Sequence, residues 1–388
     1  MLKRRNWTVQ TSLIWTALGC FIMLGLTSGA AGQGTTANPD QGKKEIQQDP
    51  QIKEILEKLV ARDDIPGVVA GIGKAGQPFR VASAGLRKFG DSRQITIQDH
   101  LHLGSCTKAI TATLIARMVE KGDFTWNTSI QQLDPILAKQ IHSQYRNATL
   151  RQMLMHQSGM PANAKNWWLN VGDDDISKTR KSILLDSLKS APKSRPGSEY
   201  VYSNLGYMAA GYFAAKKRRK TWEELVQEEV FEPLGIKSAG FGPPGTQGGV
   251  DQPWGHVKRA DGKLAPMQRD NAPALGPAGT VYMSLEDWAK FTLAHTKGGA
   301  DGFLKEVTID RLHTPDPKSK YAMGWIVVDR PWGNGKVLNH AGSNTMWYAL
   351  AWVAPETKTV YLAVTNIASA NAELDQVIGQ MIALDKKN

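Results

Sequence analysis

The sequence predicts an α+β protein in which one sheet is built from both ends of the chain and a mainly helical segment lies beside it. Two strand-like runs occur early, at residues 68–72 and 79–82, and four more follow between residues 323 and 366. The segment from about 125 to 240 shows the apolar spacing of helices, interrupted by loops. Strands at both termini with helices between them favour a single sheet flanked by helices.

Each predicted helix depends on its apolar spacing and on residues that start or stop helices. Residues 52–59 repeat apolar side chains at helical intervals, and residues 109–121 do the same before Gly122, a typical helix stop. Ser284 is placed to cap a helix over 284–295, with two acidic residues in its first turn. The other predicted helices span 149–156, 182–190, 206–215, 222–230 and 372–384. The four late strands span 323–328, 336–339, 347–353 and 359–366.

Residues 1–30 have the composition of a secretory signal peptide. Three basic residues precede an apolar run over 13–26, and small residues suited to a signal peptidase follow. The run is short for a membrane span, so a retained anchor is the lesser alternative. Residues 31–46 are typical of a flexible linker. We therefore expect an exported protein, periplasmic or secreted, with a folded domain over 47–388.

The composition, 41% hydrophobic and 21% charged, is that of a globular domain rather than a disordered chain. Cys20 lies in the predicted signal peptide, so Cys106 remains alone and no intrachain disulfide is expected. The formal net charge of +11 favours loose association with anionic polymers or lipids of a cell envelope. The basic run at 216–220 ends a predicted helix, where cations are favoured, so we expect no nucleic-acid partner.

The candidate nucleophile is Ser105, at a predicted helix start. Lys108 follows three positions later, which places both side chains on one helix face, one turn apart. A serine hydroxyl is a poor nucleophile at neutral pH unless a base takes its proton, and a neighbouring lysine can help to do so. In the alternative interpretation, Ser105 only caps the helix and Lys108 is solvated. The adjacent Cys106 is a less well spaced nucleophile, which we expect to face the helix packing.

A second motif, from Tyr202 to Asn204, precedes the predicted helix over 206–215 and lies in a loop at its entrance. A tyrosine near an ammonium group can hold a depressed pKa and act as a base. An asparagine amide can donate to a substrate carbonyl and orient the lysine. Without the other motifs, Tyr202 is equally a packed aromatic residue and Asn204 a helix cap.

A third motif, from His340 to Ser343, follows the predicted strand 336–339. Gly342 permits close approach of the backbone to a ligand, and the Ser343 N–H can complete an oxyanion hole with that of Ser105. The alternative for His340 is a satisfied structural histidine. The three motifs occur together, in this order and in suitable local contexts, and they favour a serine acyl-transfer enzyme.

These motifs resemble those of the penicillin-recognising serine hydrolases, in the branch that holds class C β-lactamases, D-alanyl-D-alanine carboxypeptidases, D-amino-acid amidases and related esterases. In this sequence they read Ser105-x-x-Lys108, Tyr202-x-Asn204 and His340-x-Gly342. The resemblance covers roughly residues 50–385. It implies a β-lactamase/transpeptidase-like fold with an antiparallel sheet flanked by helices, a mainly helical second lobe and an active site in the cleft between them. The expected α/β lobe covers about 47–105 and 270–388, and the expected helical lobe about 106–269.

The resemblance also implies roles for the motif residues. Ser105 would attack a carbonyl while Lys108 and Tyr202 shuttle its proton, and the acyl-enzyme would pass to water or another acceptor. The substrate-binding residues would be Asn204, His340, Gly342 and Ser343. His340 stands where β-lactamases carry lysine, and Ala341 where many relatives place a hydroxyl that meets the substrate carboxylate. We therefore expect weak carboxylate recognition and inefficient β-lactam hydrolysis.

The predicted function is an exported serine hydrolase, D-Ala-D-Ala carboxypeptidase or β-lactamase-like, acting on a small peptide, amide or ester. A small-ester esterase or a D-amino-acid amidase is an alternative, and a non-catalytic envelope binding protein is an alternative of another class. We expect a monomer without a cofactor. His100 and His102 lack the signature of a metal site, so we expect no metal and interpret them as strand residues.

Overall fold

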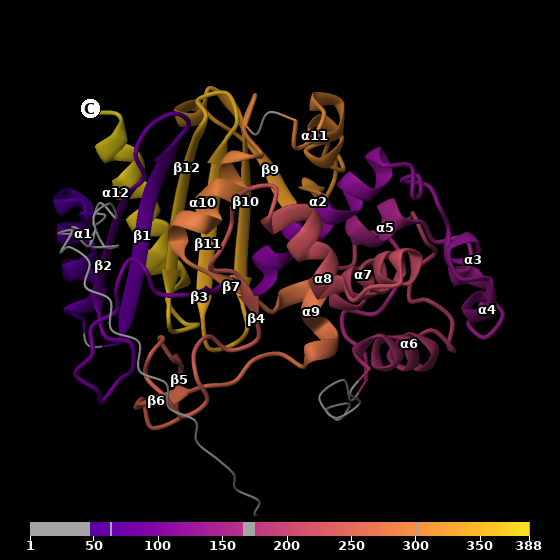
Figure 1. Cartoon of the computed structure of the whole chain (residues 1–388), viewed down its shortest axis with the longest axis horizontal. Helices are drawn as coiled ribbons and strands as arrows, with labels where there is room; N and C mark the ends of the chain where they lie inside the picture. Colours follow the sequence, from indigo (N-terminus) through magenta and orange to yellow (C-terminus); the bar gives the residue numbers. More distant parts are fainter. Residues whose placement is uncertain (1–46, 63, 166–174, 300–301, 388) are drawn as a thin grey trace, which may run out of the picture. The chain divides into compact units, whose positions relative to one another are not determined.

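A seven-stranded antiparallel sheet is built from the two ends of the folded chain (Figure 1). The computed structural model describes residues 47–62, 64–165, 175–299 and 302–387. The strands of this sheet are β1 (Gly67–Lys74), β2 (Arg80–Gly85), β8 (Tyr321–Ala322), β9 (Trp325–Arg330), β10 (Gly335–Ser343), β11 (Tyr348–Ala354) and β12 (Thr359–Thr365). Their order is β2-β1-β12-β11-β10-β9-β8, so the first hairpin pairs with the last strand. This confirms the predicted sheet.

Successive side chains of a strand point to opposite faces of the sheet, and in the central strands both sets are buried. In β1, Val68, Ala70 and Ile72 pack on one face, against α1 (Pro50–Val60) and α12 (Asn371–Asp385). Val69 points to the opposite core, to which α2 (Thr107–Glu120) and α10 (Leu285–Leu293) contribute. The sheet is therefore flanked by helices on both faces, as predicted.

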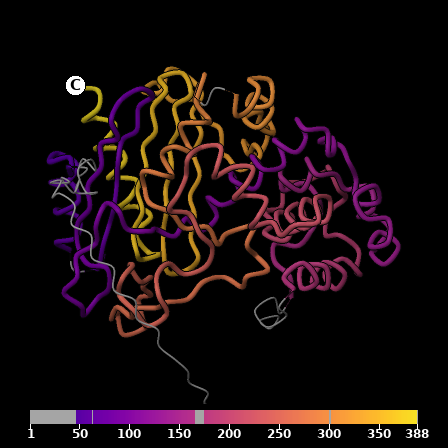
Figure 2. Tube along the Cα trace, viewed as in Figure 1, coloured from indigo at the N-terminus to yellow at the C-terminus, as the bar shows by residue number. Residues whose placement is uncertain are grey.

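The other helices lie beside the sheet, the earlier of them in the magenta part of the trace in Figure 2, and several pack around one buried helix. They are α3 (Ile130–Leu133), α4 (Pro135–Ala138), α5 (Leu150–Leu154), α6 (Ile176–Ser187), α7 (Asn204–Arg218), α8 (Trp222–Val226), α9 (Gly276–Gly279) and α11 (Glu306–Leu312). From Leu205 to Ala215 every residue of α7 is buried. The helix packs against α2, α5, α6, α8 and α9, so it links α2, the helix that follows Ser105, to the rest of the helical part.

Two smaller sheets accompany the large one. One pairs β3 (Leu101–His102) and β4 (Gly240–Phe241) with β7 (Val281–Met283), and the other pairs β5 (Gly255–Lys258) with β6 (Leu264–Met267). Strands β4 to β6 thus fall within residues 106–269, which were expected to be mainly helical. The β3–β7 pairing matters for function because it holds the chain just before Ser105 against the segment that follows α9.

Several element bounds differ from the predicted ones for local reasons. Helix α6 begins at Ile176 rather than at 182 because the Asp175 side chain caps it, accepting from the N–H groups of Ser177 and Lys178. Strand β10 continues to Ser343 rather than ending at 339, because its last residues pair with β11. The predicted helix 222–230 is divided into α8 and a π-helix over Gln227–Phe231.

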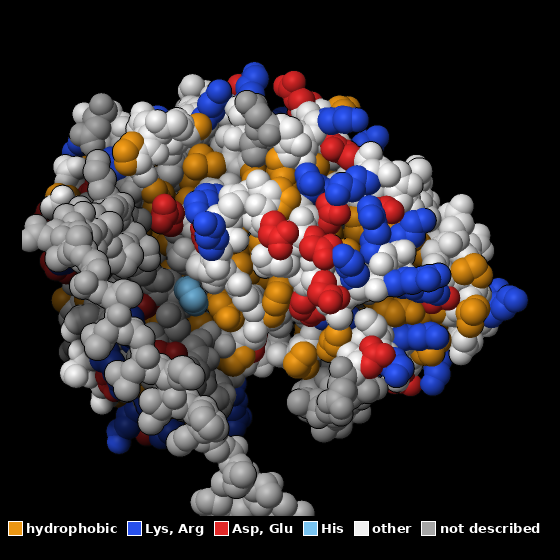
Figure 3. Space-filling model, in the orientation of Figure 1, with side chains coloured by type: hydrophobic (Ala, Val, Ile, Leu, Met, Phe, Trp, Pro, Cys, Tyr) orange, Lys and Arg blue, Asp and Glu red, His pale blue; other side chains and the backbone are white. Residues whose placement is uncertain are grey.

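The basic run at 216–220 is largely paired with acids. Lys216 lies 2.5 Å from Asp134, and two further cations of the run make contacts of the same length. These are Arg218 with Asp123 and Lys220 with Glu228. Figure 3 shows basic and acidic side chains interspersed on this side of the molecule. The run therefore fits the C-terminal end of α7, as the sequence indicated.

None of the helices in the described ranges combines the length and the apolar composition that a bilayer span needs. The predicted signal peptide over 1–30 and the predicted linker over 31–46 lie outside the described residues. The described residues from 47 onward pack as one compact unit.

Two glycines in helices test how tightly α7 packs on α9. A Cβ on Gly211 would lie 2.4 Å from Pro277 Cγ, whereas one on Gly379 of α12 would meet nothing within 4 Å. We expect Gly211→Ala to lower the free energy of unfolding by about 1–3 kcal/mol through overpacking. Gly379→Ala should raise it by up to about 1 kcal/mol, the ordinary effect in an exposed helix. Urea unfolding of both variants measures the two values, and a stabilised Gly211→Ala protein would contradict the packing described here.

Candidate active site

Ser105 lies in a short 3₁₀ turn, Gly104–Cys106, that leads directly into α2. Gly104 has a φ of +50°, and a Cβ there would lie 2.4 Å from Ser343 N. A Cβ on Gly342 of β10 would lie 2.8 Å from Ser105 N and 2.1 Å from Leu103 O. Glycine at both positions therefore permits the two backbones to touch, side by side at Ser105 and Ser343. This arrangement suits an oxyanion hole, because two N–H groups are brought together next to the candidate nucleophile.

Lys108 is fully buried and its Nζ atom lies 3.0 Å from Ser105 Oγ. The same Nζ donates a hydrogen bond of 2.7 Å to the carbonyl of Ala278 in α9. Burial, which disfavours the charged form, lowers the pKa of Lys108 to about 7. Lys108 is therefore not a solvated lysine, and Ser105 makes no capping hydrogen bond at the start of α2. Both findings exclude the alternative interpretation of this motif.

Tyr202 completes the contacts of Ser105, with its hydroxyl 2.9 Å from Ser105 Oγ. The expected depression of its pKa is not found, because burial raises the pKa of Tyr202 to about 12. Lys108 Nζ lies 4.9 Å from the centre of the Tyr202 ring, but a lysine whose pKa is near 7 carries little charge above neutral pH. Near neutral pH the Lys108 amine is therefore able to accept a proton, and Tyr202 is a protonated hydroxyl that donates to Ser105 Oγ.

His156 contacts the loop that carries Tyr202. The sequence analysis did not predict it as a site residue. Its ring centre lies 4.4 Å from that of Tyr202, and its Nδ1 accepts a hydrogen bond of 3.0 Å from Ser203 N–H. Its own carbonyl accepts from Val201 N–H at 2.8 Å. The sequence placed His156 at the end of a predicted helix, but the residue has a φ of +57° and turns the chain after α5.

Asn204 is free to face the site because another residue caps α7. The Ser203 hydroxyl accepts from Gly206 N–H at 2.9 Å, which excludes the interpretation of Asn204 as the cap. The Asn204 amide donates to Asn163 Oδ1 at 2.8 Å. A small cavity is lined by Ser105, Asn204, Asn271, Leu275, Ala278, Gly279 and Ser343. Asn271, which no sequence motif indicated, donates from Nδ2 to the Gly279 carbonyl at 2.8 Å.

His340 lies within β10, not after it, and only 4% of its surface is exposed. Burial lowers the pKa of His340 to about 3, and the neighbouring Lys108 lowers it further in the same direction. The ring is therefore neutral and cannot replace a fixed positive charge.

Cys106 Sγ lies 3.6 Å from the His340 carbonyl, and burial raises the pKa of this thiol. Cys106 therefore packs against the sheet as a protonated thiol, which excludes it as the nucleophile.

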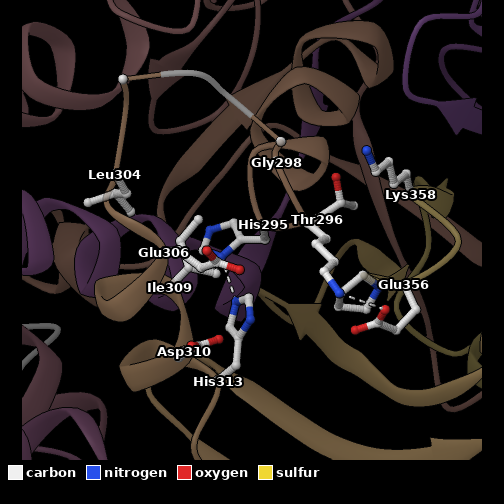
Figure 4. Close-up of a pocket in the computed structure, with 14 residues that line it drawn as sticks. His295, Thr296, Gly298, Leu304, Glu306, Ile309, Asp310, His313, Glu356 and Lys358 are labelled. Carbon is white, nitrogen blue, oxygen red and sulfur yellow. Dashed lines mark hydrogen bonds and ion pairs between the residues drawn. The ribbon is translucent and has the colours of Figure 1, made fainter.

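A larger cavity, of about 600 Å³, is lined mainly by residues of the chain after α10, of α11 and of the turn between β11 and β12 (Figure 4). His295 Nδ1 and His313 Nε2 lie 3.0 Å apart in it. Burial lowers the pKa of both imidazoles, that of His313 to about 3. No serine, cysteine or tyrosine is among the residues that line it. In the described ranges no cluster of three or more metal-ligating side chains is positioned to hold an ion.

The fold and the Ser105 constellation define a serine hydrolase of the β-lactamase type. The Beta-lactamase family model matches residues 52–382, and the chain belongs to this family. Among its relatives, the Bacillus subtilis (strain 168) protein PbpX is 24% identical over 405 residues, which cover 98% of this chain and 96% of that protein. Penicillin-binding protein 4 of Amycolatopsis lactamdurans is 22% identical and covers 81% of this chain and 84% of its own length.

Solved structures show the same fold. A class C β-lactamase superposes with a TM-score of 0.73 at 17% identity, covering 86% of this chain and 95% of that one. The D-amino acid amidase from Ochrobactrum anthropi SV3, in complex with L-phenylalanine, superposes with a TM-score of 0.70 at 20% identity, covering 87% and 98%. The sequence-based assignment to this family and fold is thereby confirmed.

The burial of Lys108 predicts an unusual dependence of stability on pH. The lysine titrates near pH 7 in the folded protein but near its ordinary pKa of 10.5 when unfolded. Between these values the unfolded chain binds one more proton, so the free energy of unfolding rises with pH, by up to about 1.4 kcal/mol per pH unit. Lys108→Met has no titrating group at this position. Its free energy of unfolding, relative to that of the wild type, should therefore fall between pH 7 and pH 10.

Urea unfolding at pH 7, 8.5 and 10 measures the effect. Lys139 is exposed at the end of α4, so Lys139→Met should follow the wild-type curve. Parallel curves for wild type and Lys108→Met would show that Lys108 titrates normally.

Proposed function

We propose that this chain is an exported serine hydrolase that forms an acyl-enzyme on Ser105, with Lys108 as the general base. The observation that carries the proposal is that Ser105 Oγ lies 3.0 Å from the buried Lys108 amine and 2.9 Å from the Tyr202 hydroxyl. An unprotonated amine so close to a serine hydroxyl can accept its proton during attack on a carbonyl. Ser105, Lys108 and Tyr202 are all present and in contact, which counts against the alternative of a non-catalytic binding protein.

The proposed reaction has two halves. As Ser105 Oγ bonds to the carbonyl carbon, its proton passes to Lys108, and the N–H groups of Ser105 and Ser343 stabilise the resulting oxyanion. The Tyr202 hydroxyl gives its proton to the departing amine or alkoxide as the scissile bond breaks, and Lys108 returns a proton to Tyr202, which leaves Lys108 neutral again. Water then attacks the acyl-enzyme and gives its proton to Lys108, and as the bond to Ser105 Oγ breaks Lys108 passes this proton to Oγ, so that the acid is released and both residues are restored.

The substrate is proposed to be a small amide, peptide or ester without a carboxylate next to the scissile bond. A neutral His340 and the methyl group of Ala341 offer no charge or hydroxyl to bind such a carboxylate. The likeness to a D-amino acid amidase supports an amidase or esterase. A D-Ala-D-Ala carboxypeptidase or β-lactamase-like activity is the second candidate, which similarity to a penicillin-binding protein supports.

We propose that the protein acts as a periplasmic or secreted monomer, loosely associated with the envelope, without a nucleic-acid partner.

Intact-mass measurement of the purified protein after incubation with p-nitrophenyl acetate, and separately with a penicillin, tests this proposal. We expect an acetyl adduct on Ser105 whose rate of formation rises as the pH passes about 7, because the lysine must be neutral to accept the proton. Ser105→Ala should lower turnover at least about 10⁴-fold, while Cys106→Ala should retain the adduct. An unchanged adduct in the Ser105→Ala protein would refute the nucleophile. A long-lived penicillin adduct would favour the second candidate.

Ala341→Thr tests the proposed substrate class. The new hydroxyl supplies a hydrogen bond to a carboxylate, and we expect kcat/KM for a D-alanyl-D-alanine peptide to rise roughly tenfold. The same peptide with an amidated C-terminus is the matched substrate and should be hydrolysed at an unchanged rate. Equal effects on both substrates would show that position 341 does not meet the carboxylate.

A further inference from the structure

A buried cluster of polar side chains connects the two backbone segments that carry the N–H groups of Ser105 and Ser343. His102 is fully buried, Asn344 is 2% exposed and the side chain of Asp270 is 3% exposed. His102 precedes Ser105 by three residues, and Asn344 directly follows Ser343. None of the three belongs to the motifs that identify the reaction, so their burial requires a separate explanation.

His102 holds the segment of the nucleophile. Its Nδ1 accepts a hydrogen bond of 3.1 Å from the N–H of Gly104, the residue before Ser105. An imidazole nitrogen that accepts carries no proton, so the ring proton resides on Nε2. Nε2 lies 2.8 Å from Asp270 Oδ2, a close polar contact, and neither atom makes a hydrogen bond in the described part of the chain. The carboxylate therefore lies against the ring nitrogen that carries the proton, while the other nitrogen holds Gly104.

The other oxygen of Asp270 holds the opposite segment. Oδ1 accepts a hydrogen bond of 3.0 Å from Asn344 Nδ2. Asn344 in turn accepts at Oδ1 from the N–H groups of Met346 and Trp347, at 3.2 and 3.0 Å, and so shapes the turn between β10 and β11. One carboxylate thus connects Gly104 to Asn344, across the contact at which Ser105 and Ser343 meet.

We propose that Asp270 is a positioning residue that, through His102 and Asn344, sets the relative placement of the two oxyanion-hole N–H groups. The inference rests on the proposed acyl-enzyme function. Such a hole stabilises the transition state only when both donors are held where the charge develops. A buried carboxylate is expensive to desolvate, and an apolar cluster would support the fold as well or better. Its retention is explained by the geometry that it imposes on the two backbones.

Asp270→Asn tests the proposal with the smallest change of shape. Both His102 Nε2–H and Asn344 Nδ2–H are donors, and an amide offers one oxygen where the carboxylate offers two. The amide must therefore face one donor with its own N–H groups, and one segment loses its support. The matched control is Asp99→Asn, because the Asp99 side chain is 2% exposed and pairs with Arg87 at 2.6 Å without contacting either segment.

We expect Asp270→Asn to lower the rate of Ser105 acylation by p-nitrophenyl acetate about a hundredfold, the effect of impairing one oxyanion donor. KM should change less than threefold. Binding of phenylboronic acid, which forms a tetrahedral adduct with the serine, should weaken by a similar factor to the rate. Asp99→Asn should lower Tm comparably but acylate within threefold of wild type. Acylation of Asp270→Asn within threefold of wild type would overturn the proposal.

A pair of substitutions at His102 keeps the test decisive if Asp270→Asn does not fold. Asn at 102 can still accept from the N–H two residues later, as in an Asx turn, whereas Leu cannot. His102→Asn should therefore acylate at least tenfold faster than His102→Leu. Equal rates would overturn the positioning role. Absence of any Ser105 adduct in the wild-type protein would instead refute the proposed function, and this inference with it.

Discussion

The burial of the Lys108 amine is the constraint on which the site depends. Its Nζ atom is excluded from water by α2, α7 and α9, with the Tyr207 ring centre 5.7 Å away and the Ala278 carbonyl as an acceptor. In such surroundings the uncharged amine is favoured near neutral pH. A lysine exposed at the same distance from Ser105 would be protonated and could not accept its proton. The helical part of the molecule therefore supplies the surroundings that the proposed base needs, although the lysine itself belongs to a helix that packs on the sheet.

The second requirement is contact between backbones that are distant in sequence. Gly104 and Gly342 are separated by more than 200 residues, and each lacks the Cβ that would force the other's neighbours apart. The β3–β7 pairing on one side and the β10–β11 pairing on the other fix the two segments. The proposed reaction centre thus depends on three separate parts of the fold: the large sheet, the small sheet that contains β3 and β7, and the buried helix α7.

The sequence predicted the parts of the fold that depend on local pattern. Apolar periodicity located the six long strands and helices α1, α2, α7, α10 and α12, and one-turn spacing paired Ser105 with Lys108. It failed where packing decides the outcome. The pKa of Tyr202 rises because the ring is buried among residues from distant segments, including His156. His102 was interpreted as an ordinary strand residue, since its partner Asp270 lies 168 positions away and no local pattern connects them.

The single described cysteine has a consequence for the chemistry of the protein outside its own reaction. Cys106 is covered by β10 and β11, with its Sγ atom 3.6 Å from one carbonyl and 4.0 Å from another, and its thiol pKa is raised. Disulfide exchange requires an accessible thiolate. Among the described residues, the folded protein therefore offers no thiol for a mixed disulfide, and the backbone next to Ser105 is not displaced by such a modification.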